Sequence, residues 1–319
     1  MAELKNTFSW SFSAASDFEE CRRKRYWAKY AMWGGWSKSA SPVQRAAYRL
    51  SKMGNFHLLK GEAVEQAIMW VLRQKQIGKD ETLDSAYQTV ARPFLNDSWL
   101  ASKNRLWEGD PKRYYCLLEH YYQRLTPESE KQVVDSVKDD ITRCIDSFIK
   151  FVLPRLVHVK QAMELPIAVG GRGDPEHFTL GDIKIYAIPD YAYQESGRCY
   201  IYDWKSGRQR EQHKQQLALY GMWANVKHGV KPEDIELSVQ YLLEGMGEPV
   251  PFSDEVLVGV TEKIKSSVHD MAEYLVGGDI VQNLAVPREE WDMVAEPQIC
   301  RNCAFYELCK PELGSSVEL

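Results

Sequence analysis

The sequence lacks the marks of several common protein classes. No stretch approaches the roughly 20 uninterrupted apolar residues that a membrane helix needs. The N-terminal sequence MAELKNTFSW contains no apolar segment of the kind found in a secretory signal. A GxxxxGK[ST] motif is also missing, which argues against an NTPase motor, and there is no internal repeat. These absences predict a cytoplasmic protein without membrane association.

Positive charge is not in excess either. The formal net charge is −5 at pH 7, whereas proteins that coat duplex nucleic acid are usually basic. The bulk charge does not exclude a nuclease, because a metal site concentrates carboxylates while basic residues cluster elsewhere. The 319 residues are 44% hydrophobic, which is enough for a sizeable core in one large domain or in one domain with a helical insertion.

Apolar periodicity predicts a mixed α/β protein. Helical spacing predicts helices at about 16–30, from Pro42 and from Gly61, and short alternating runs after Pro154 predict three strands. A helix at 211–228 and a further strand, IELSVQYLLEG, follow them. The expected organisation has four parts, which are an N-terminal helical segment at 1–60, a core at 61–80 and 155–285, a helical insertion at 81–154 and a C-terminal segment at 286–319.

Two aspartates and a lysine stand at the ends of predicted strands. Asp190 ends the second strand in AIPD, and Asp203 and Lys205 end the third in IYDWKSG. Residues two apart on a strand share a face, and a hairpin between the two strands brings Asp190 beside Asp203. Paired carboxylates can hold Mg²⁺ or Mn²⁺, and Lys205 can orient a water or stabilise charge on a phosphate. The alternative is a pair of turn aspartates and a solvated lysine.

These residues belong to motifs that resemble the RecB-type branch of the PD-(D/E)XK nucleases. The family reads G-x-x-D, D-x-K-[ST]-G and Q-x-x-x-Y, and Ala187 replaces its first glycine. The resemblance implies a restriction-endonuclease-like αβββαβ core and a supporting role for Gln216 and Tyr220 in holding DNA or the lysine. Without that role, Gln216 is a surface residue and Tyr220 packs in the core. The matching residues are Pro189-Asp190, Asp203-Trp204-Lys205-Ser206-Gly207 and Gln216-Leu217-Ala218-Leu219-Tyr220.

A third acidic residue is implied by the same resemblance. The family places a metal-binding His in a helical G-x-x-[VIL]-H motif, and here Glu65 stands at the His position of Gly61-Glu62-Ala63-Val64-Glu65. Glu65 is then a metal ligand with Asp190 and Asp203, in an all-oxygen site that favours Mg²⁺. The alternative is a surface glutamate. Glu164, on the first predicted strand, is a weaker candidate for a supporting carboxylate.

Four of the seven cysteines form a separate pattern. Cys300, Cys303 and Cys309 are clustered, and Cys21 lies in SFSAASDFEECRRKRYW. This segment resembles the N-terminal motif of iron–sulfur nucleases of the AddB and CRISPR-adaptation exonuclease kind, although Arg22 and Arg25 depart from it. The resemblance implies a [4Fe–4S] cluster that joins the N- and C-terminal segments. A zinc site and four unrelated thiols remain alternatives.

The resemblance implies a Mg²⁺- or Mn²⁺-dependent deoxyribonuclease, in particular an exonuclease acting on single strands or ends. Its expected setting is DNA repair, recombination, phage replication or CRISPR adaptation, with a helicase or another repair or defence subunit as a candidate partner. A scaffold subunit that binds nucleic acid without cutting it and an RNA-directed nuclease are the alternatives. The runs Arg22–Arg25 and Arg208, Arg210 and Lys214 are candidate phosphate contacts or else solvated faces.

Overall fold

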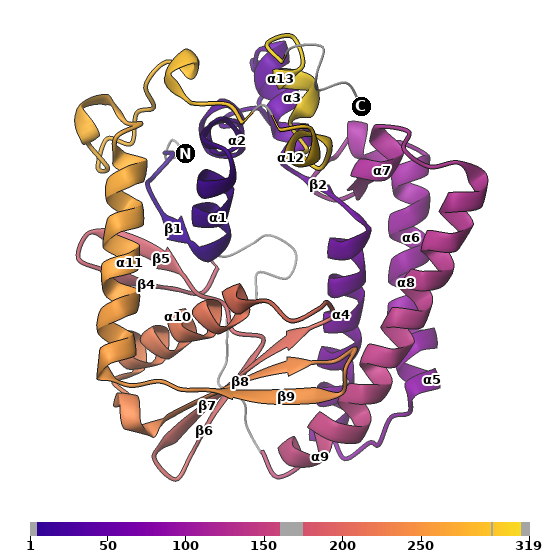
Figure 1. The fold of residues 1–319 in the computed structure, drawn as a ribbon. Coiled ribbons are helices and arrows are strands. Elements are labelled where there is room, and N and C mark those ends of the chain that lie inside the picture. The colour runs from indigo at the N-terminus through magenta and orange to yellow at the C-terminus, as the bar shows by residue number, and fades with distance from the viewer. Residues whose placement is uncertain (1–4, 160–174, 295, 314–319) are drawn as a thin grey trace.

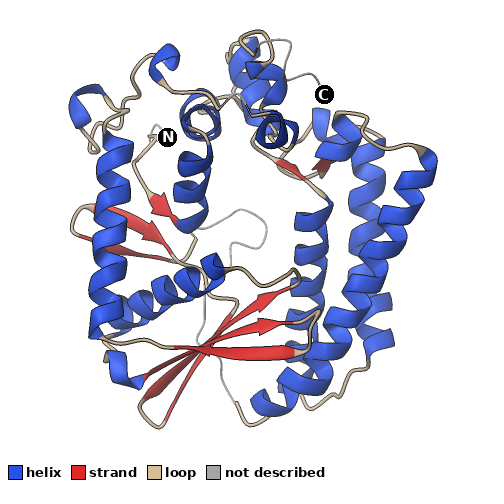
Figure 2. Cartoon of the chain, viewed as in Figure 1, coloured by secondary structure: helices blue, strands red, loops and turns tan. Residues whose placement is uncertain are grey.

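The computed structural model describes residues 5–159, 175–294 and 296–313 (Figure 1). Helices and strands form a mixed α/β fold, as the sequence predicts (Figure 2). Within the described residues, none of the helices has the length and apolar character needed to cross a membrane. The helices are α1 Phe12–Glu20, α2 Arg22–Tyr26, α3 Pro42–Leu50, α4 Phe56–Gln76, α5 Leu83–Ala86, α6 Arg92–Lys103, α7 Leu118–Tyr121, α8 Pro127–Ser147, α9 Leu153–Leu156, α10 Glu211–His228, α11 Asp254–Ala272, α12 Pro297–Arg301 and α13 Tyr306–Cys309.

The described strands form two larger sheets and one short pair. The main sheet has the order β6-β7-β8-β9, the second sheet has the order β1-β5-β4, and β2 pairs with β3. The strands are β1 Trp10–Ser11, β2 Met53–Gly54, β3 Cys116–Leu117, β4 His177–Leu180, β5 Ile183–Tyr186, β6 Tyr191–Glu195, β7 Arg198–Lys205, β8 Ile235–Tyr241 and β9 Met246–Val250.

The main sheet contains the predicted hairpin. β6 and β7 are antiparallel, and their turn uses Ser196 at φ 51° and Gly197 at φ 83°, the left-handed values that a tight two-residue hairpin requires. β7 and β8 are parallel, so the chain must cross over between them, and α10 is that crossover. The predicted order of strand, helix and strand from 198 to 241 is therefore present.

The predicted second strand is divided, which corrects the prediction for Asp190. β4 and β5 form a hairpin that pairs with β1 in the separate second sheet, and β5 ends at Tyr186. Pro189 has no N–H to donate to a ladder, so the strand cannot continue through it as a paired central strand. Asp190 consequently lies just before β6 rather than at the end of a strand. The first predicted strand, which contains Glu164, lies outside the described residues.

Both faces of the main sheet are covered. One apolar core joins the sheet to α10, α11, α1 and Trp291. The other core joins it to α4, α6 and α8, and there Phe148 meets Trp204 edge-on at 5.4 Å. The helices that follow α4 therefore share a core with the sheet, while the division of the chain into four parts stays a prediction. α4 begins at Phe56, five residues before Gly61, because Asn55 caps it by accepting a bond from the N–H of Leu58.

The helices α2 and α3, near the start of the chain, lie beside α12 and α13, near its end (Figure 1). Phe305 packs with Trp27, Ala47 and Leu50 in one small core. Arg23 is 3% exposed, donates from Nε to the carbonyl of Trp291 and forms an ion pair with Glu312 at 3.0 Å.

The N-terminal cationic run is therefore partly structural. Lys24 pairs with Asp17 at 2.7 Å, and the guanidinium of Arg22 lies 4.1 Å from the ring of Phe18. These two contacts stay within the N-terminal segment, whereas buried Arg23 links that segment to Trp291 and Glu312 near the other end of the chain. The prediction that the whole run contacts phosphates is wrong for Arg23, because that side chain is buried and paired.

Candidate active site

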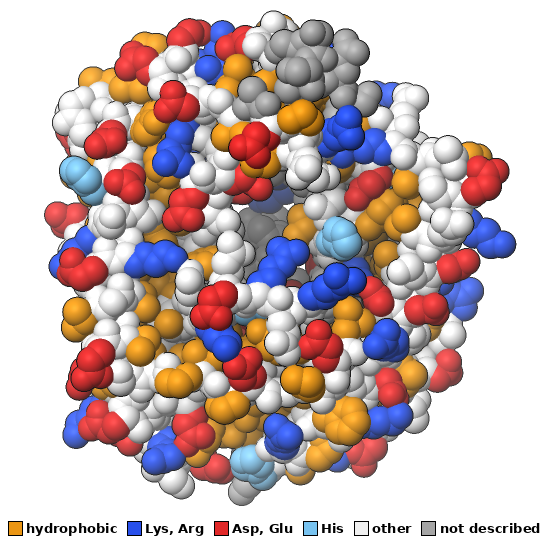
Figure 3. All heavy atoms as spheres, in the orientation of Figure 1, with side chains coloured by type: hydrophobic (Ala, Val, Ile, Leu, Met, Phe, Trp, Pro, Cys, Tyr) orange, Lys and Arg blue, Asp and Glu red, His pale blue; other side chains and the backbone are white. Residues whose placement is uncertain are grey.

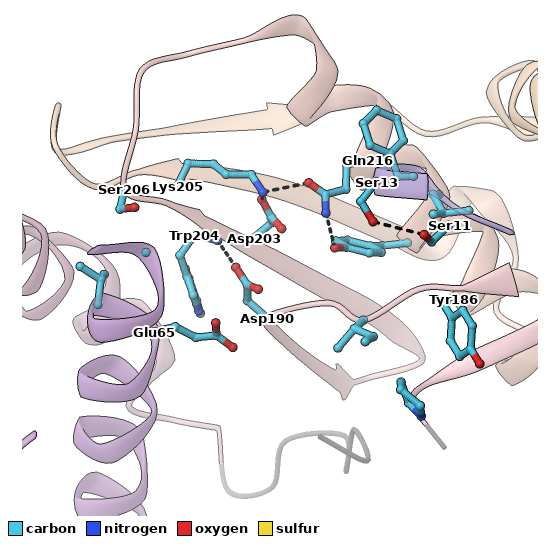
Figure 4. Close-up of a pocket in the computed structure, with 17 residues that line it drawn as sticks. Ser11, Ser13, Glu65, Tyr186, Asp190, Asp203, Trp204, Lys205, Ser206 and Gln216 are labelled. Atoms are coloured by element: carbon cyan, nitrogen blue, oxygen red, sulfur yellow. Dashed lines mark hydrogen bonds and ion pairs between the residues drawn. The ribbon is translucent and has the colours of Figure 1, made fainter. Parts of the chain in front are cut away.

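A pocket of about 700 Å³ opens where α4, the end of β7, the first turns of α10 and the start of α1 meet. The predicted catalytic and supporting residues of the core line it, except for Glu164, which lies outside the described residues. They come from separate parts of the chain, and those labelled in Figure 4, from Glu65 to Gln216, point toward one another. These residues are Glu65, Asp190, Asp203, Lys205, Gln216 and Tyr220.

The hairpin places Asp190 next to Asp203. Tyr191 is opposite Tyr202 in the ladder, so the preceding Asp190 falls beside Asp203, and its Oδ2 accepts a hydrogen bond of 2.6 Å from the N–H of Trp204. Asp203 is 1% exposed. Burial, then the charge of Asp203, raises the pKa of Asp190 well above its ordinary value, and burial also raises the pKa of Asp203. A buried and a half-buried carboxylate repel each other here, and a bound cation relieves such repulsion.

Lys205 is fixed at the centre of the pocket by its neighbours. Its Nζ lies 2.6 Å from Oδ2 of Asp203 and donates a hydrogen bond of 2.9 Å to Oε1 of Gln216. Gln216 in turn donates from Nε2 to the phenol oxygen of Tyr220 at 2.7 Å. Gln216 and Tyr220 are four apart on α10 and so share one face of that helix. The sequence motif D-x-K followed by Q-x-x-x-Y thus describes one continuous polar network.

Glu65 reaches the pocket from the opposite wall. It lies on α4, and its carboxylate points toward Asp190 (Figure 4). Partial desolvation, then the charges of Glu62 and Asp203, raises the pKa of Glu65. Glu65 is exposed at the pocket mouth, whereas Asp203 is buried and Asp190 is half-buried.

This donor set suits a hard divalent cation. Three carboxylates face one pocket, and the raised pKa values of Asp190 and Asp203 mark charge that is not fully compensated by Lys205. Oxygen ligands of this kind are the ones that Mg²⁺ and Mn²⁺ prefer. Within the described ranges, no three His, Cys, Asp or Glu side chains are already close enough to form a finished metal site.

The N-terminal segment also contributes to the pocket, a contact that the core motifs did not predict. Ser11 caps α1 by accepting a bond from the N–H of Ala14, and both Ser11 and Ser13 line the pocket (Figure 4). The helix therefore starts at Phe12, earlier than the predicted start at about residue 16. Ser11 and Ser13 belong to the N-terminal motif that the sequence analysis recognised. That motif gave no indication that β1 pairs with β5, and it is this pairing that places the two serines at the pocket.

Cationic side chains lie near the pocket as well. Arg208 and Arg210 are exposed in the loop between β7 and α10. Lys214 pairs with Glu248 at 2.6 Å, so it is partly neutralised. Burial, then the nearby charges of Lys205 and Arg210, lowers the pKa of His213 to about 4, which keeps this imidazole neutral near pH 7.

The comparison with protein families agrees with this geometry. A model described as the PD-(D/E)XK nuclease superfamily matches residues 9–310, most of the chain. The chain belongs to the PD-(D/E)XK nuclease superfamily. No curated protein sequence matches it. Members of this superfamily are generally nucleases, which are hydrolases, and they typically use divalent metals such as Mg²⁺.

The four cysteines of the second pattern line one small cavity at the junction of the two chain ends. Apolar side chains such as Val294, Ile299 and Leu313 complete its wall. The indole N–H of Trp27 donates to Sγ of Cys309 at 3.2 Å. Burial raises the pKa of the Cys303 thiol to about 12 and that of Cys309 to about 11, with a further contribution from Cys21 in both cases. Cys21 and the C-terminal cysteines are therefore neighbours, although within the described residues they do not form a finished metal site.

Proposed function

We propose that this protein is a Mg²⁺- or Mn²⁺-dependent deoxyribonuclease that hydrolyses phosphodiester bonds, acting as an exonuclease on single strands or ends. The observation that carries the proposal is the meeting of Asp190, Asp203 and Lys205 with Glu65 in one pocket. Its superfamily membership supports hydrolysis of nucleic acid. The choice of DNA and of exonuclease action comes from the sequence resemblance.

Glu65, Asp190 and Asp203 are the proposed ligands of the metal. A divalent ion bound there supplies a polarised phosphate oxygen and a bound water of lowered pKa. Lys205 supplies a fixed positive charge where the attacked phosphate gains negative charge. A lysine ammonium has three N–H donors, and because Asp203 and Gln216 occupy two of its directions, the third can be directed at substrate.

Gln216 and Tyr220 are proposed to position Lys205 rather than to touch the reacting atoms. Burial, then the charges of Asp203 and Asp190, raises the pKa of Tyr220 well above its ordinary value, so its phenol stays neutral. A neutral phenol accepts the bond from Gln216, which turns Oε1 of that amide toward Lys205. Glu164 remains proposed only as a supporting carboxylate, by resemblance.

Backbone phosphates are the proposed contact of Arg208 and Arg210. On the face seen in Figure 3, several Lys and Arg side chains flank a central hollow. Phosphate contacts of this kind give binding that weakens with salt and tolerates different sequences. A helicase or another repair or defence subunit remains the proposed kind of partner, on the resemblance alone.

We also propose that Cys21, Cys300, Cys303 and Cys309 bind a [4Fe–4S] cluster. Their shared cavity and the contact between the chain ends support a four-thiolate site. Protein purified without oxygen should be brown and contain iron, and Cys21→Ala should lose the iron while Cys144→Ala keeps it. Colourless protein loaded with zinc would favour the zinc alternative, and four thiols that all react with an alkylating reagent would favour no metal at all.

Substrate competition separates the alternatives to a deoxyribonuclease. Labelled single-stranded DNA is incubated with protein and Mg²⁺ or Mn²⁺, with unlabelled RNA, duplex DNA or circular single-stranded DNA as competitors. The proposal predicts release of mononucleotides or short products from linear DNA and little competition by RNA. DNA that is bound but never cut, under either metal, would favour the scaffold alternative.

A further inference from the structure

A second groove, of about 740 Å³, lies beside the active-site pocket on the helices that follow α4. Its walls are the turn after α3, the first turns of α4, the length of α6 and the segment 111–115. The motifs on which the resemblance in the sequence rests do not include α6 or residues 111–115. One side of the groove therefore belongs to the part of this chain that the resemblance left without a role.

The two cavities use neighbouring faces of one helix. Leu58 and Glu62 of α4 line the groove, whereas Gly61 and Glu65 line the active-site pocket. Each pair is four residues apart, so each pair marks one face, and the two faces differ by about 60° around a helix of 3.6 residues per turn. Each of these α4 residues that lines one cavity lies within one helical turn of a residue that lines the other. A strand that extends from the active site past α4 therefore reaches the groove.

Cations and aromatic rings are interleaved along the groove. Lys52, Lys112 and Arg113 line it, and the guanidinium of Arg113 lies 5.2 Å from the ring of Tyr114. Burial, then the charge of Lys112, lowers the pKa of Lys52, so the two ammonium groups are close enough to repel each other. An anion between them removes that repulsion.

The remaining walls are apolar and open to solvent. Phe94, Leu100 and Leu106 line the groove, and the two leucines are 55% and 46% exposed. Two carboxylates are present, but that of Glu62 accepts a hydrogen bond from the phenol of Tyr115, and Asp97 is exposed at the rim. Among the described lining residues, cations outnumber carboxylates by one. Flat rings and leucines beside cations are suited to bases and phosphates together.

We propose that this groove binds an unpaired segment of the substrate strand adjacent to the bond being cut, with its phosphates on Lys52, Lys112 and Arg113 and a base on Tyr114. The inference rests on the proposed nuclease function and names the form of substrate that the site selects. A base can stack on a tyrosine only when it is unpaired from a complementary strand, so the groove favours single strands or frayed ends over closed duplex.

The test compares a long substrate, which can contact both cavities, with a short one, which can contact only the active site. Oligothymidylate can span both cavities, whereas the p-nitrophenyl ester of thymidine 5′-phosphate contains one phosphodiester and reaches only the active site. The variants are the triple change Lys52→Ala, Lys112→Ala, Arg113→Ala and the single change Tyr114→Ala. The matched control is Lys131→Ala, Lys138→Ala, which removes exposed cations from α8. Oligothymidylate binding is measured by anisotropy in Ca²⁺ over a series of salt concentrations.

We expect the triple variant to bind oligothymidylate at least tenfold more weakly and to hydrolyse the ester within twofold of wild type. Its slope of log Kd against log salt should fall by about 2, because each phosphate contact to a single strand contributes about 0.7. Tyr114→Ala should weaken binding by about tenfold with the salt slope unchanged, since stacking on one base contributes about 1–3 kcal/mol. The α8 control should behave as wild type.

Unchanged oligothymidylate affinity in both groove variants would overturn the inference. An equal loss of affinity for a closed duplex hairpin would also overturn it, because the groove would then read phosphates without selecting unpaired bases. Failure of the proposed function has a different signature, which is wild-type protein that hydrolyses neither substrate in Mg²⁺ or Mn²⁺. The anisotropy measurement needs no hydrolysis and still decides the role of the groove in that case.

Discussion

Lys205 donates a hydrogen bond of 2.9 Å to Oε1 of Gln216, a residue on the helix that crosses between two parallel strands of the main sheet. This bond ties the cation of the proposed active site to α10 and, together with the ion pair to Asp203, fixes the direction of the lysine side chain in the pocket. Several consequences of that arrangement can be measured.

Replacing Gln216 with Ala should lower kcat by ten- to a hundredfold and leave KM nearly unchanged. A hydrogen bond to a charged group contributes about 1.5–3 kcal/mol, and each 1.4 kcal/mol corresponds to about a tenfold change in rate. Steady-state kinetics on single-stranded DNA measures both constants. Gln215→Ala is the control, because Gln215 is exposed and bonds to Lys263 outside the pocket. A rise in KM without a fall in kcat would mean that Gln216 contacts substrate instead.

Replacing Asp190 with Asn should abolish cleavage and stabilise the metal-free protein at neutral pH. The pKa of Asp190 is higher in the folded protein than in the unfolded chain. The folded protein therefore binds more protons between those two values, and its stability falls as pH rises from the unfolded pKa through the folded one. Asn removes the buried charge but keeps an oxygen that accepts from the N–H of Trp204.

Thermal unfolding in EDTA checks this effect. At pH 7.5 the midpoint of Asp190→Asn should exceed that of wild type by about 2 °C or more, and the difference should vanish below about pH 3, where most aspartates carry protons in the unfolded chain as well. The exposed Asp135→Asn is the control. A variant that is less stable than wild type at pH 7.5 would show that the carboxylate of Asp190 is compensated by groups already present.

Divalent metal should stabilise the wild-type protein through the same carboxylates. A ligand that binds only the folded state adds about 2.7 kcal/mol at a hundredfold excess over its Kd. Titration with Mg²⁺ or Mn²⁺ should thus raise the midpoint of wild type and leave that of Asp203→Ala unchanged. An equal rise in both proteins would place the stabilising metal elsewhere.

Replacing Trp27 with Phe should change the proposed iron–sulfur cluster without removing a ligand. The indole N–H donates to Sγ of Cys309, and hydrogen bonds to cluster sulfurs favour the more negative, reduced state. The reduction potential of Trp27→Phe should therefore be more negative than that of wild type, with the same iron content, as measured by redox titration of the visible absorption. Trp36→Phe, which alters a 45% exposed indole, is the control. An identical potential in both variants would contradict this role for Trp27.

The parts of the site that the sequence predicted are those fixed by local geometry. Asp203 and Lys205 share a face because they are two apart on β7, and Gln216 and Tyr220 share one because they are four apart on α10. A tight turn at Ser196 and Gly197 then brings Asp190 to Asp203. Short-range periodicity is enough to place all of these residues.

Contacts between distant segments could not be predicted in the same way. β1 pairs with β5 more than 170 residues later in the chain, and that pairing brings Ser11 and Ser13 to the pocket. Arg23 is buried against Trp291, although a run of four cations normally predicts an exposed face. The second groove likewise depends on how α6 and segment 111–115 pack on α4. These contacts depend on tertiary packing, and the local spacing of residues in the sequence does not predict them.

Digestion of end-labelled single-stranded DNA in Mg²⁺ or Mn²⁺ tests the central claim most directly, with wild type, Lys205→Ala and Lys138→Ala purified in parallel. We predict metal-dependent cutting by wild type and by Lys138→Ala, no cutting in EDTA, and a loss of at least a hundredfold in Lys205→Ala. Cutting by Lys205→Ala at the wild-type rate would contradict the account, because the activity would then arise from a different site.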